Sequence, residues 1–380
     1  MGDDQQVYTM IQQADTVGVF QIESRAQMSM LPRLKPRTYY DLVIQIAIVR
    51  PGPIQGDMVH PFLKRRDGIK SISYPSKDVE SVLSRTLGVP IFQEQVIKLA
   101  MVAAGFTGGE ADQLRRAMAA WKKNGNVFKF KTKLIEGMQK RGYETEFAEQ
   151  IFKQICGFGE YGFPESHSAS FAVLAYCSAW LKCYYPECFY ASLLNSQPMG
   201  FYSPSQLVQD AQRHNVTILP VCVNASQNDH TVVSQQNGLA IRLGLRQIKG
   251  LSEHGIQSVL ANRPHSGYRH PSQVKQLSMN KKDIELLASA NALHNVSGDR
   301  FQTRWAIMDS TSDLPLFSQV YDDTENGHGE HTLHKPNEMQ DLLEDFTSVG
   351  ISLNKHPITL LEEANRLGRF THMKDLIQQR

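Results

Sequence analysis

The sequence lacks the features that mark several large classes of protein. Its five cysteines form no Cys-x-x-Cys pair, so neither a zinc site nor a disulfide framework is expected. No run of about 18 apolar residues occurs, so no helix is expected to cross a membrane. The first residues have neither the basic nor the apolar part of a signal peptide. These absences favour a cytoplasmic protein with reduced thiols.

The chain also lacks a large excess of either positive or negative charge. The chain has 40 Lys and Arg against 38 Asp and Glu, which gives a net charge of only +2 over 380 residues. Any basic surface for nucleic acid must therefore be local. At roughly 100–200 residues per domain, the length predicts two or three domains.

Common catalytic and phosphate-binding motifs are absent. There is no Walker A loop, no Gly-x-Gly-x-x-Gly, no Gly-x-Ser-x-Gly and no His-Glu-x-x-His. There is also no Asp-x-Asp pair, and Asp3-Asp4 and Asp322-Asp323 lie in polar stretches. The sequence itself therefore predicts no metal ligands and no catalytic residue in this chain.

Helical periodicity dominates, and it predicts a mainly α fold with a small α+β segment around 216–243. The expected helices are Gln93–Ala104, Glu110–Ala120, Phe128–Lys140, Glu144–Ile155, Ser166–Tyr185, Ser205–His214, Ile248–Leu260 and Lys281–Ala290. Helix Ser166–Tyr185 is long and apolar, so we expect it to be buried on most sides. Two β-rich runs are expected, Val216–Val223 and Leu239–Leu243.

Breaker residues and composition suggest the domain boundaries. The cluster Pro198–Pro204 ends the first part, and the polar stretch Asp309–Pro336 reads as a linker. We expect a core at 1–197, an extension at 198–298, a flexible linker at 299–336 and a connector at 337–380.

Two stretches place arginine where phosphate can be bound. Arg50 follows the apolar run Leu42–Val49, and a rigidly held guanidinium suits phosphate. Arg115 and Arg116 lie inside a predicted helix among several lysines. The alternatives are a surface arginine that caps a helix and a solvated basic face.

The loop between the expected helices Glu144–Ile155 and Ser166–Tyr185 is the most unusual stretch of the sequence. Glycines and a proline lead to Ser166, the expected N-cap, and to His167, so a helix N-terminus there can bind an anion. Tyr161 and Phe163 are suited to stacking on a base or sugar. The alternative is a hydrophobic staple and cap with nothing bound.

Residues 248–260 fit a helix-hairpin-helix pattern. Such a hairpin directs backbone N–H groups at a DNA phosphate, and Arg246, Lys249 and Gly250 are the residues expected to take part. A purely structural helical hairpin is the alternative.

Several stretches, in this order, resemble the C-family DNA polymerases, the alpha subunits of bacterial DNA polymerase III. They are Gly18–Arg25, Arg50–Pro53, Phe92–Gln95, Leu114–Met118, Tyr161–Phe163, Ser166–Ser168 and Ile248–Gly250. Within the family, three segments look most like the error-prone, damage-tolerance branch. They are Gly52–Pro61, Gly162–His167 and Leu194–Tyr202. The resemblance covers nearly the whole chain.

The resemblance implies a fingers domain, a helix-hairpin-helix and a connector, without the palm aspartates that hold catalytic Mg²⁺. The chain is therefore expected to be incomplete and to catalyse nothing alone, since the chemistry needs two metals held by carboxylates. It implies that Arg50, Arg115 and Arg116 bind the dNTP triphosphate. The residues implied for the sugar and base are Tyr161, Ser166 and His167, and those for primer-template DNA are Ser24, Arg25, Arg246, Lys249 and Gly250.

The resemblance also implies partners. Asp313–Phe317 is similar to a sliding-clamp peptide, but Asp313 replaces the glutamine and Pro315 stiffens the strand. Clamp contact is expected either directly through this segment or through a partner protein, beside accessory mutagenesis proteins. Two other functions remain open: a non-catalytic DNA-binding adaptor, and the fingers of a replicative polymerase.

Overall fold

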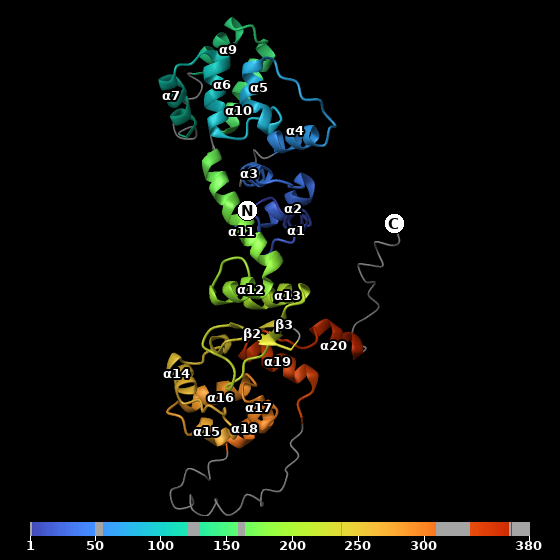
Figure 1. The fold of residues 1–380 in the computed structure, drawn as a ribbon, viewed down its shortest axis with the longest axis vertical. Coiled ribbons are helices and arrows are strands. Elements are labelled where there is room, and N and C mark those ends of the chain that lie inside the picture. Colours follow the sequence, from blue (N-terminus) through green and yellow to red (C-terminus); the bar gives the residue numbers. More distant parts are fainter. Residues whose placement is uncertain are drawn as a thin grey trace, which may run out of the picture. The chain divides into compact units, whose positions relative to one another are not determined.

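The computed structural model describes residues 2–49, 56–119, 130–158, 164–236, 238–308, 335–364 and 366. Side chains are described for these residues except 56–60, 118–119, 154–158 and 308. The chain forms two compact units, Met1–Tyr184 and Tyr185–Arg380 (Figure 1).

The regular secondary structure of the first unit, over its described residues, is helical. Its helices are α1 (Gln5–Gln12), α2 (Arg25–Leu34), α3 (Tyr39–Ile48), α4 (Gly56–Arg66), α5 (Lys77–Leu83), η2 (Ser84–Thr86), α6 (Gln93–Ala104), α7 (Gly108–Ala119), α9 (Lys131–Lys140), α10 (Thr145–Phe158) and α11 (Glu165–Tyr184). Helix α6 packs against α5, α7 and α9, whereas α11 packs along α3 and α1 (Figure 1).

Helix α6 has the bounds expected from its periodicity. Gln95 fixes its start: its Oε1 accepts hydrogen bonds from the Ile91 and Phe92 N–H groups at 2.8 and 3.1 Å. Gly105, with φ +74°, ends the helix in the left-handed region, where glycine has no steric penalty. Helix α7 begins at Gly108, two residues before the start predicted at Glu110.

Helix α11 differs from its prediction in how much of it is buried. It buries Ala172, Ala175 and Ala179 against its neighbours, as its small residues favour. Val173 and Leu174, however, are 49% and 52% exposed, so this helix is buried on one side and not on most sides. Periodicity missed this because the apolar residues surround the helix instead of forming one stripe.

The second unit combines helices with a small sheet. Its elements are α12 (Pro186–Asn195), α13 (Pro204–Arg213), β1 (Thr217–Leu219), β2 (Thr231–Gln235), β3 (Gly238–Arg242), η4 (Leu245–Gln247), α14 (Glu253–Ala261), α15 (Pro271–Lys275), α16 (Lys281–Ser289), α17 (His294–Ser297), α18 (Arg300–Met308), α19 (Glu338–Ser348) and α20 (Pro357–Glu363). The mainly α fold with a small α+β segment is confirmed.

The sheet has the order β1-β3-β2. Strands β1 and β3 are parallel, with Ile218 opposite Ile241, and β2 is antiparallel to β3, with Val232 also opposite Ile241. Residues of β1 and β3 lie in the two runs predicted as strands, but β2 was not predicted.

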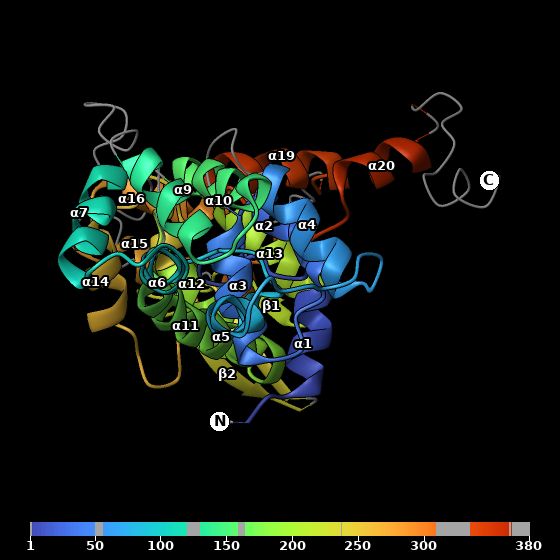
Figure 2. The ribbon, with the colours of Figure 1, turned by 90° about the horizontal axis from the view of Figure 1, so that it is seen from above.

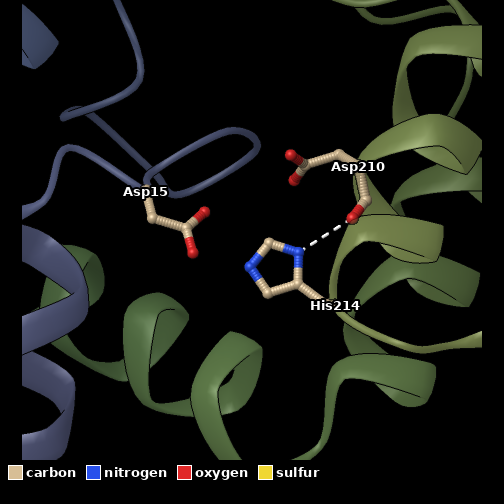
Figure 3. A group of neighbouring side chains, drawn as sticks. All are labelled: Asp15, Asp210 and His214. Atoms are coloured by element: carbon tan, nitrogen blue, oxygen red, sulfur yellow. Dashed lines mark hydrogen bonds between the residues drawn. The ribbon is translucent and has the colours of Figure 1, made fainter. Parts of the chain in front are cut away.

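Side-chain hydrogen bonds join α12 to α13. The Tyr190 hydroxyl of α12 donates to Asp210 Oδ2 of α13 at 2.6 Å. At the C-cap of α13, His214 Nδ1 lies 2.8 Å from the Asp210 carbonyl oxygen (Figure 3). Asp210 is buried, so the hydrogen bond from Tyr190 satisfies a carboxylate that would otherwise be costly to bury.

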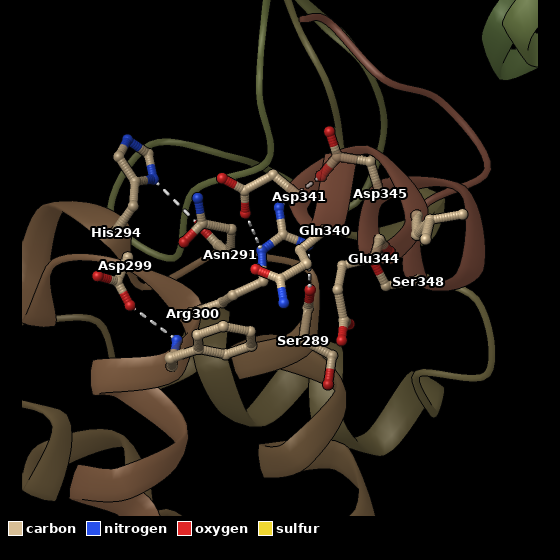
Figure 4. Close-up of polar contacts among 12 residues, drawn as sticks. Ser289, Asn291, His294, Asp299, Arg300, Gln340, Asp341, Glu344, Asp345 and Ser348 are labelled. Carbon is tan, nitrogen blue, oxygen red and sulfur yellow. Dashed lines mark hydrogen bonds and ion pairs between the residues drawn. The ribbon is translucent and has the colours of Figure 1, made fainter. Parts of the chain in front are cut away.

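Helix α19 is held to α18 by charge (Figure 4). Buried Arg300 lies with its Nε 2.9 Å from Asp341 Oδ1 and its Nη2 2.6 Å from Asp345 Oδ1. Arg304 binds both oxygens of Glu344, at 3.0 and 2.6 Å. Figure 2 shows α20 beyond the end of α19.

Among the described helices, none has the length and apolar character needed to cross a bilayer.

Candidate nucleic-acid interface

The arginine pair of α7 is gathered by one carboxylate. Asp112 Oδ1 lies 2.9 Å from Arg115 Nη2, and Asp112 Oδ2 lies 2.7 Å from Arg116 Nη2. These hydrogen bonds, that of Arg115 first, lower the pKa of Asp112. Adjacent residues on a helix point about 100° apart, so an acid three and four positions earlier can bring both guanidiniums to one side. Sequence reasoning missed Asp112, although its spacing from the two arginines was the available signal.

Both guanidiniums are accessible. The Arg115 and Arg116 side chains are 42% and 74% exposed. Each arginine also donates through Nε to the Asp112 carboxylate, at 3.0 and 2.8 Å. The Nη1 group of each guanidinium therefore points away from Asp112. The pair can therefore offer two forks to a polyphosphate, with one negative charge already beside them.

The start of α11 differs from its prediction. The helix begins at Glu165, so Ser166 lies in its first turn and is not the N-cap. The Glu165 N–H donates to Glu94 Oε2 at 3.0 Å, so a carboxylate already interacts with this helix N-terminus. The side chain of Glu165 is held by the Tyr40 hydroxyl at 2.8 Å and by Arg85 Nη1 at 3.3 Å. An anion would therefore meet two carboxylates here.

Ser166 and His167 are both exposed, and His167 belongs to a row of rings. The His167 and Phe171 ring centroids are 4.1 Å apart, and those of Phe171 and Phe20 are 5.3 Å apart in an edge-on arrangement. Phe20 is 39% exposed. This row of rings connects the motif Gly18–Arg25 with the motif Ser166–Ser168, which lie far apart in sequence. Aromatic faces of this kind can stack on bases.

The segment that carries Phe20 is fixed on α11. The Lys182 side chain is fully buried, and its Nζ donates to Asp15 Oδ1 at 2.9 Å and to the Val17 carbonyl oxygen at 3.1 Å. Ser24 is the N-cap of α2, since its Oγ accepts from the Gln27 N–H at 3.3 Å, and exposed Arg25 starts that helix. The structure thus brings the Ser24 and Arg25 segment and His167 to the same part of the first unit.

The hairpin of the second unit consists of η4, the loop 248–252 and α14. The prediction that Ile248–Leu260 is one helix is wrong over its first five residues, because the helix begins at Glu253. Gly250 adopts φ +80°, which needs glycine, and Ser252 Oγ caps α14 through the Gly255 N–H at 2.9 Å. This turn leaves Lys249 and Gly250 exposed.

The two hairpin cations have partners in the second unit. Arg246 Nη1 lies 2.9 Å from Asp229 Oδ1 and 3.2 Å from the Asn195 carbonyl oxygen. Lys249 Nζ donates to the Phe346 carbonyl oxygen at 2.6 Å, at the C-terminal end of α19. The side chains of Arg246 and Lys249 are thus held in place beside the loop by contacts within the second unit.

Some predicted residues cannot be placed. Arg50, Tyr161 and the segment Asp313–Phe317 lie outside the described residues. Within either unit taken alone, the described side chains bring no three carboxylate, imidazole or thiolate ligands together. Four of the cysteines, Cys177, Cys183, Cys188 and Cys222, are free thiols.

Comparison with known proteins finds two families that match stretches of this chain. Residues 2–142 match the family described as Bacterial DNA polymerase III alpha subunit finger domain, and residues 215–303 match the Helix-hairpin-helix motif. Over residues 2–142 the chain is thus similar to the finger domain of the bacterial DNA polymerase III alpha subunit. The two matches include the α7 arginine pair and the hairpin loop, respectively.

Individual relatives point to one branch of this family. The chain is 67% identical over 378 residues to the error-prone DNA polymerase of Vibrio campbellii, covering 99% of this chain and 36% of that protein. It is 55% identical over 379 residues to the error-prone DNA polymerase of Idiomarina loihiensis, with coverage of 99% and 36%. The chain thus spans little more than a third of the length of these relatives.

Proposed function

We propose that this chain is the nucleotide- and DNA-binding part of an error-prone DNA polymerase, which adds dNTPs to a primer in damage-induced mutagenesis and translesion synthesis. The observation that carries the proposal is the exposed Arg115 and Arg116 pair inside the stretch that matches the finger domain. Similarity to error-prone DNA polymerases supports the choice of branch. The proposed location is the cytoplasm.

In this proposal the arginine pair binds the triphosphate. Two guanidiniums can neutralise non-bridging oxygens and stabilise the charge that develops on the leaving pyrophosphate. Asp112 keeps both on one side of α7 before the nucleotide arrives. Arg50 and Tyr161 remain proposed contributors to the same site.

His167 and Ser166 are proposed for the sugar and base side of the nucleotide. The ring row through Phe171 to Phe20 supports this role, because it offers exposed aromatic surface next to His167. The carboxylates of Glu94 and Glu165 at the start of α11 argue against the triphosphate lying there. Ser24 and Arg25 are proposed to contact primer-template DNA.

The hairpin is proposed to bind the DNA backbone through Arg246, Lys249 and Gly250. Contacts of this kind are independent of base sequence and depend strongly on salt. Magnesium would be required for nucleotide addition, and we assign none of the described residues to it. Contact with a sliding clamp, direct or through a partner, and with accessory mutagenesis proteins remains part of the proposal.

The DNA-binding part can be tested by fluorescence anisotropy on labelled duplex DNA at several salt concentrations. Arg246→Ala and Lys249→Ala should each weaken binding and lower the slope of log K against log[salt] by about 0.9. The exposed residue Lys282, on α16, gives the matched control Lys282→Ala. Equal effects of all three changes would contradict a specific role for the hairpin.

A DNA-binding adaptor without nucleotide specificity is the competing function. The pairing of both α7 arginines with Asp112 is the observation that keeps it open, because a paired cation contributes less to ligand binding. Nucleotide binding that depends on Arg115 and Arg116 would exclude it.

A further inference from the structure

A pocket of about 640 Å³ lies beside the hairpin loop in the second unit. One wall is the hairpin itself, residues 246–251, and the opposite wall comes from the segment between α12 and α13. The residues of that second wall are Leu194, Gln197, Pro198, Ser203, Pro204 and Ser205. The lining includes the cations Arg246 and Lys249 and no carboxylate. The pocket therefore favours an anion.

The second wall carries a buried donor without an acceptor. Gln197 Nε2 has no hydrogen-bond partner within the described parts of the chain. The other end of this amide is fixed, because Oε1 accepts the Met199 N–H at 3.0 Å. A buried amide donor without a partner costs free energy, which a ligand oxygen would recover.

The first turn of α13 adds a second donor. Ser203 is the N-cap, and its Oγ accepts the Gln206 N–H at 3.3 Å. Pro204 has no N–H, and in the described structure no acceptor is found for the Ser205 N–H. This amide lies at the positive end of a ten-residue helix, where negative charge is stabilised.

The hairpin wall supplies the remaining donors. Arg246 and Lys249 are held at the wall by Asp229 and by the Phe346 carbonyl oxygen. The Gly250 N–H also lacks an acceptor among the described residues, and Gly250 is exposed. Donors on both walls and two cations call for an anion with several oxygens. A phosphate group has that chemistry.

We propose that this pocket holds a phosphate of a nucleic-acid strand between the hairpin and the Gln197–Ser205 segment. The proposal rests on the proposed DNA binding of the hairpin and adds a second, opposing set of contacts to it. The volume falls in the range of about 300–1,000 Å³ found for ligand pockets, so there is room for the attached sugar. Leu194, Pro198 and Leu251 give that sugar an apolar surface.

The test uses two glutamines that differ in their relation to the pocket. Gln197→Glu keeps the Oε1 acceptor but replaces the free amide donor by a negative charge. Gln206→Glu makes the same change on α13, where Gln206 Oε1 accepts the Ser203 N–H at 3.0 Å and does not line the pocket. The full 380-residue chain is titrated with labelled duplex DNA at several salt concentrations.

The proposal expects Gln197→Glu to weaken DNA binding by about five- to tenfold, because a like charge would lie about 4 Å from the phosphate. Gln206→Glu should stay within about twofold of the wild type. Equal binding by the two variants would overturn the proposal, while loss of binding in Lys249→Ala would still support the hairpin. Failure of the wild type to bind DNA would overturn both.

Inorganic phosphate separates the two sources of the ligand. If phosphate displaces DNA from the wild type more than chloride does at equal ionic strength, and does so less from Gln197→Glu, the pocket accepts the free ion. If the two salts act alike while Gln197→Glu still weakens DNA binding, the pocket accepts phosphate only as part of a strand. Both results support the proposal.

Discussion

Removal of Arg300 should detach α19 from the second unit. The Arg300 side chain is 2% exposed and is the shared partner of Asp341 and Asp345, whose side chains are 30% and 14% exposed. Its Nη1 also donates to the Ser289 carbonyl oxygen at 3.1 Å. Arg300→Ala would leave two partly buried carboxylates without a cation (Figure 4).

Breaking a buried ion pair by removing one partner costs about 3–5 kcal/mol. Since Asp341 remains partly in water, we expect the lower end, about 3 kcal/mol, for Arg300→Ala. The matched control is Arg304→Ala, one turn later on α18, whose ion pair with Glu344 is 30% and 28% exposed. That change should cost about 1 kcal/mol.

Hydrogen exchange of the α19 amides measures this difference, because it reports local opening of one helix even when two units unfold separately. Arg300→Ala should speed exchange across Glu338–Ser348 far more than Arg304→Ala does. Adding Asp341→Asn and Asp345→Asn to Arg300→Ala should restore part of the protection. Equal protection in both single variants would refute the reasoning.

Three further predictions concern pH, backbone conformation and charge. Burial, followed by the charge of Arg246, lowers the pKa of His230 to about 4, so the folded state resists protonation that the unfolded chain accepts below about 6.5. Between pH 7 and 5 the wild type should therefore lose about 2 kcal/mol more than His230→Gln in urea unfolding. Gly250→Ala should cost about 1–2 kcal/mol through its φ of +80° alone, since the new Cβ would meet only Leu286 Cδ1, at 3.7 Å; thermal unfolding measures this. Asp112→Asn, on an exposed surface, should leave Tm nearly unchanged, and a clear drop would mean that Asp112 supports the fold.

Local signals in the sequence were sufficient for many elements. The apolar periodicity of Gln93–Ala104 predicted the bounds that the structure has, and the structure adds that Gly105 ends the helix. Strand β2 was missed, since Thr231–Gln235 is short and mostly polar or half-exposed, and it is held by pairing with β3. Such pairing depends on residues that are close only after folding.

In the candidate site, too, some residues are marked by local sequence patterns and others only by contacts that form on folding. Arg115 and Arg116 were found as a motif, but Asp112 was missed, although its spacing of three and four residues from them is a local signal for both ion pairs. The carboxylate of Glu94 at the start of α11 joins residues far apart in sequence. No local pattern reveals a contact of that kind.

The central claim is that this chain binds an incoming nucleotide through the α7 arginine pair. Its most direct test is dNTP binding in the presence of primed DNA and magnesium, with wild type compared to Arg115→Ala/Arg116→Ala and to the matched pair Lys281→Ala/Lys282→Ala on α16. We predict that the wild type and the lysine variant bind dNTP and that the arginine variant does not. Undiminished dNTP binding by the arginine variant, or none by the wild type, would contradict the account.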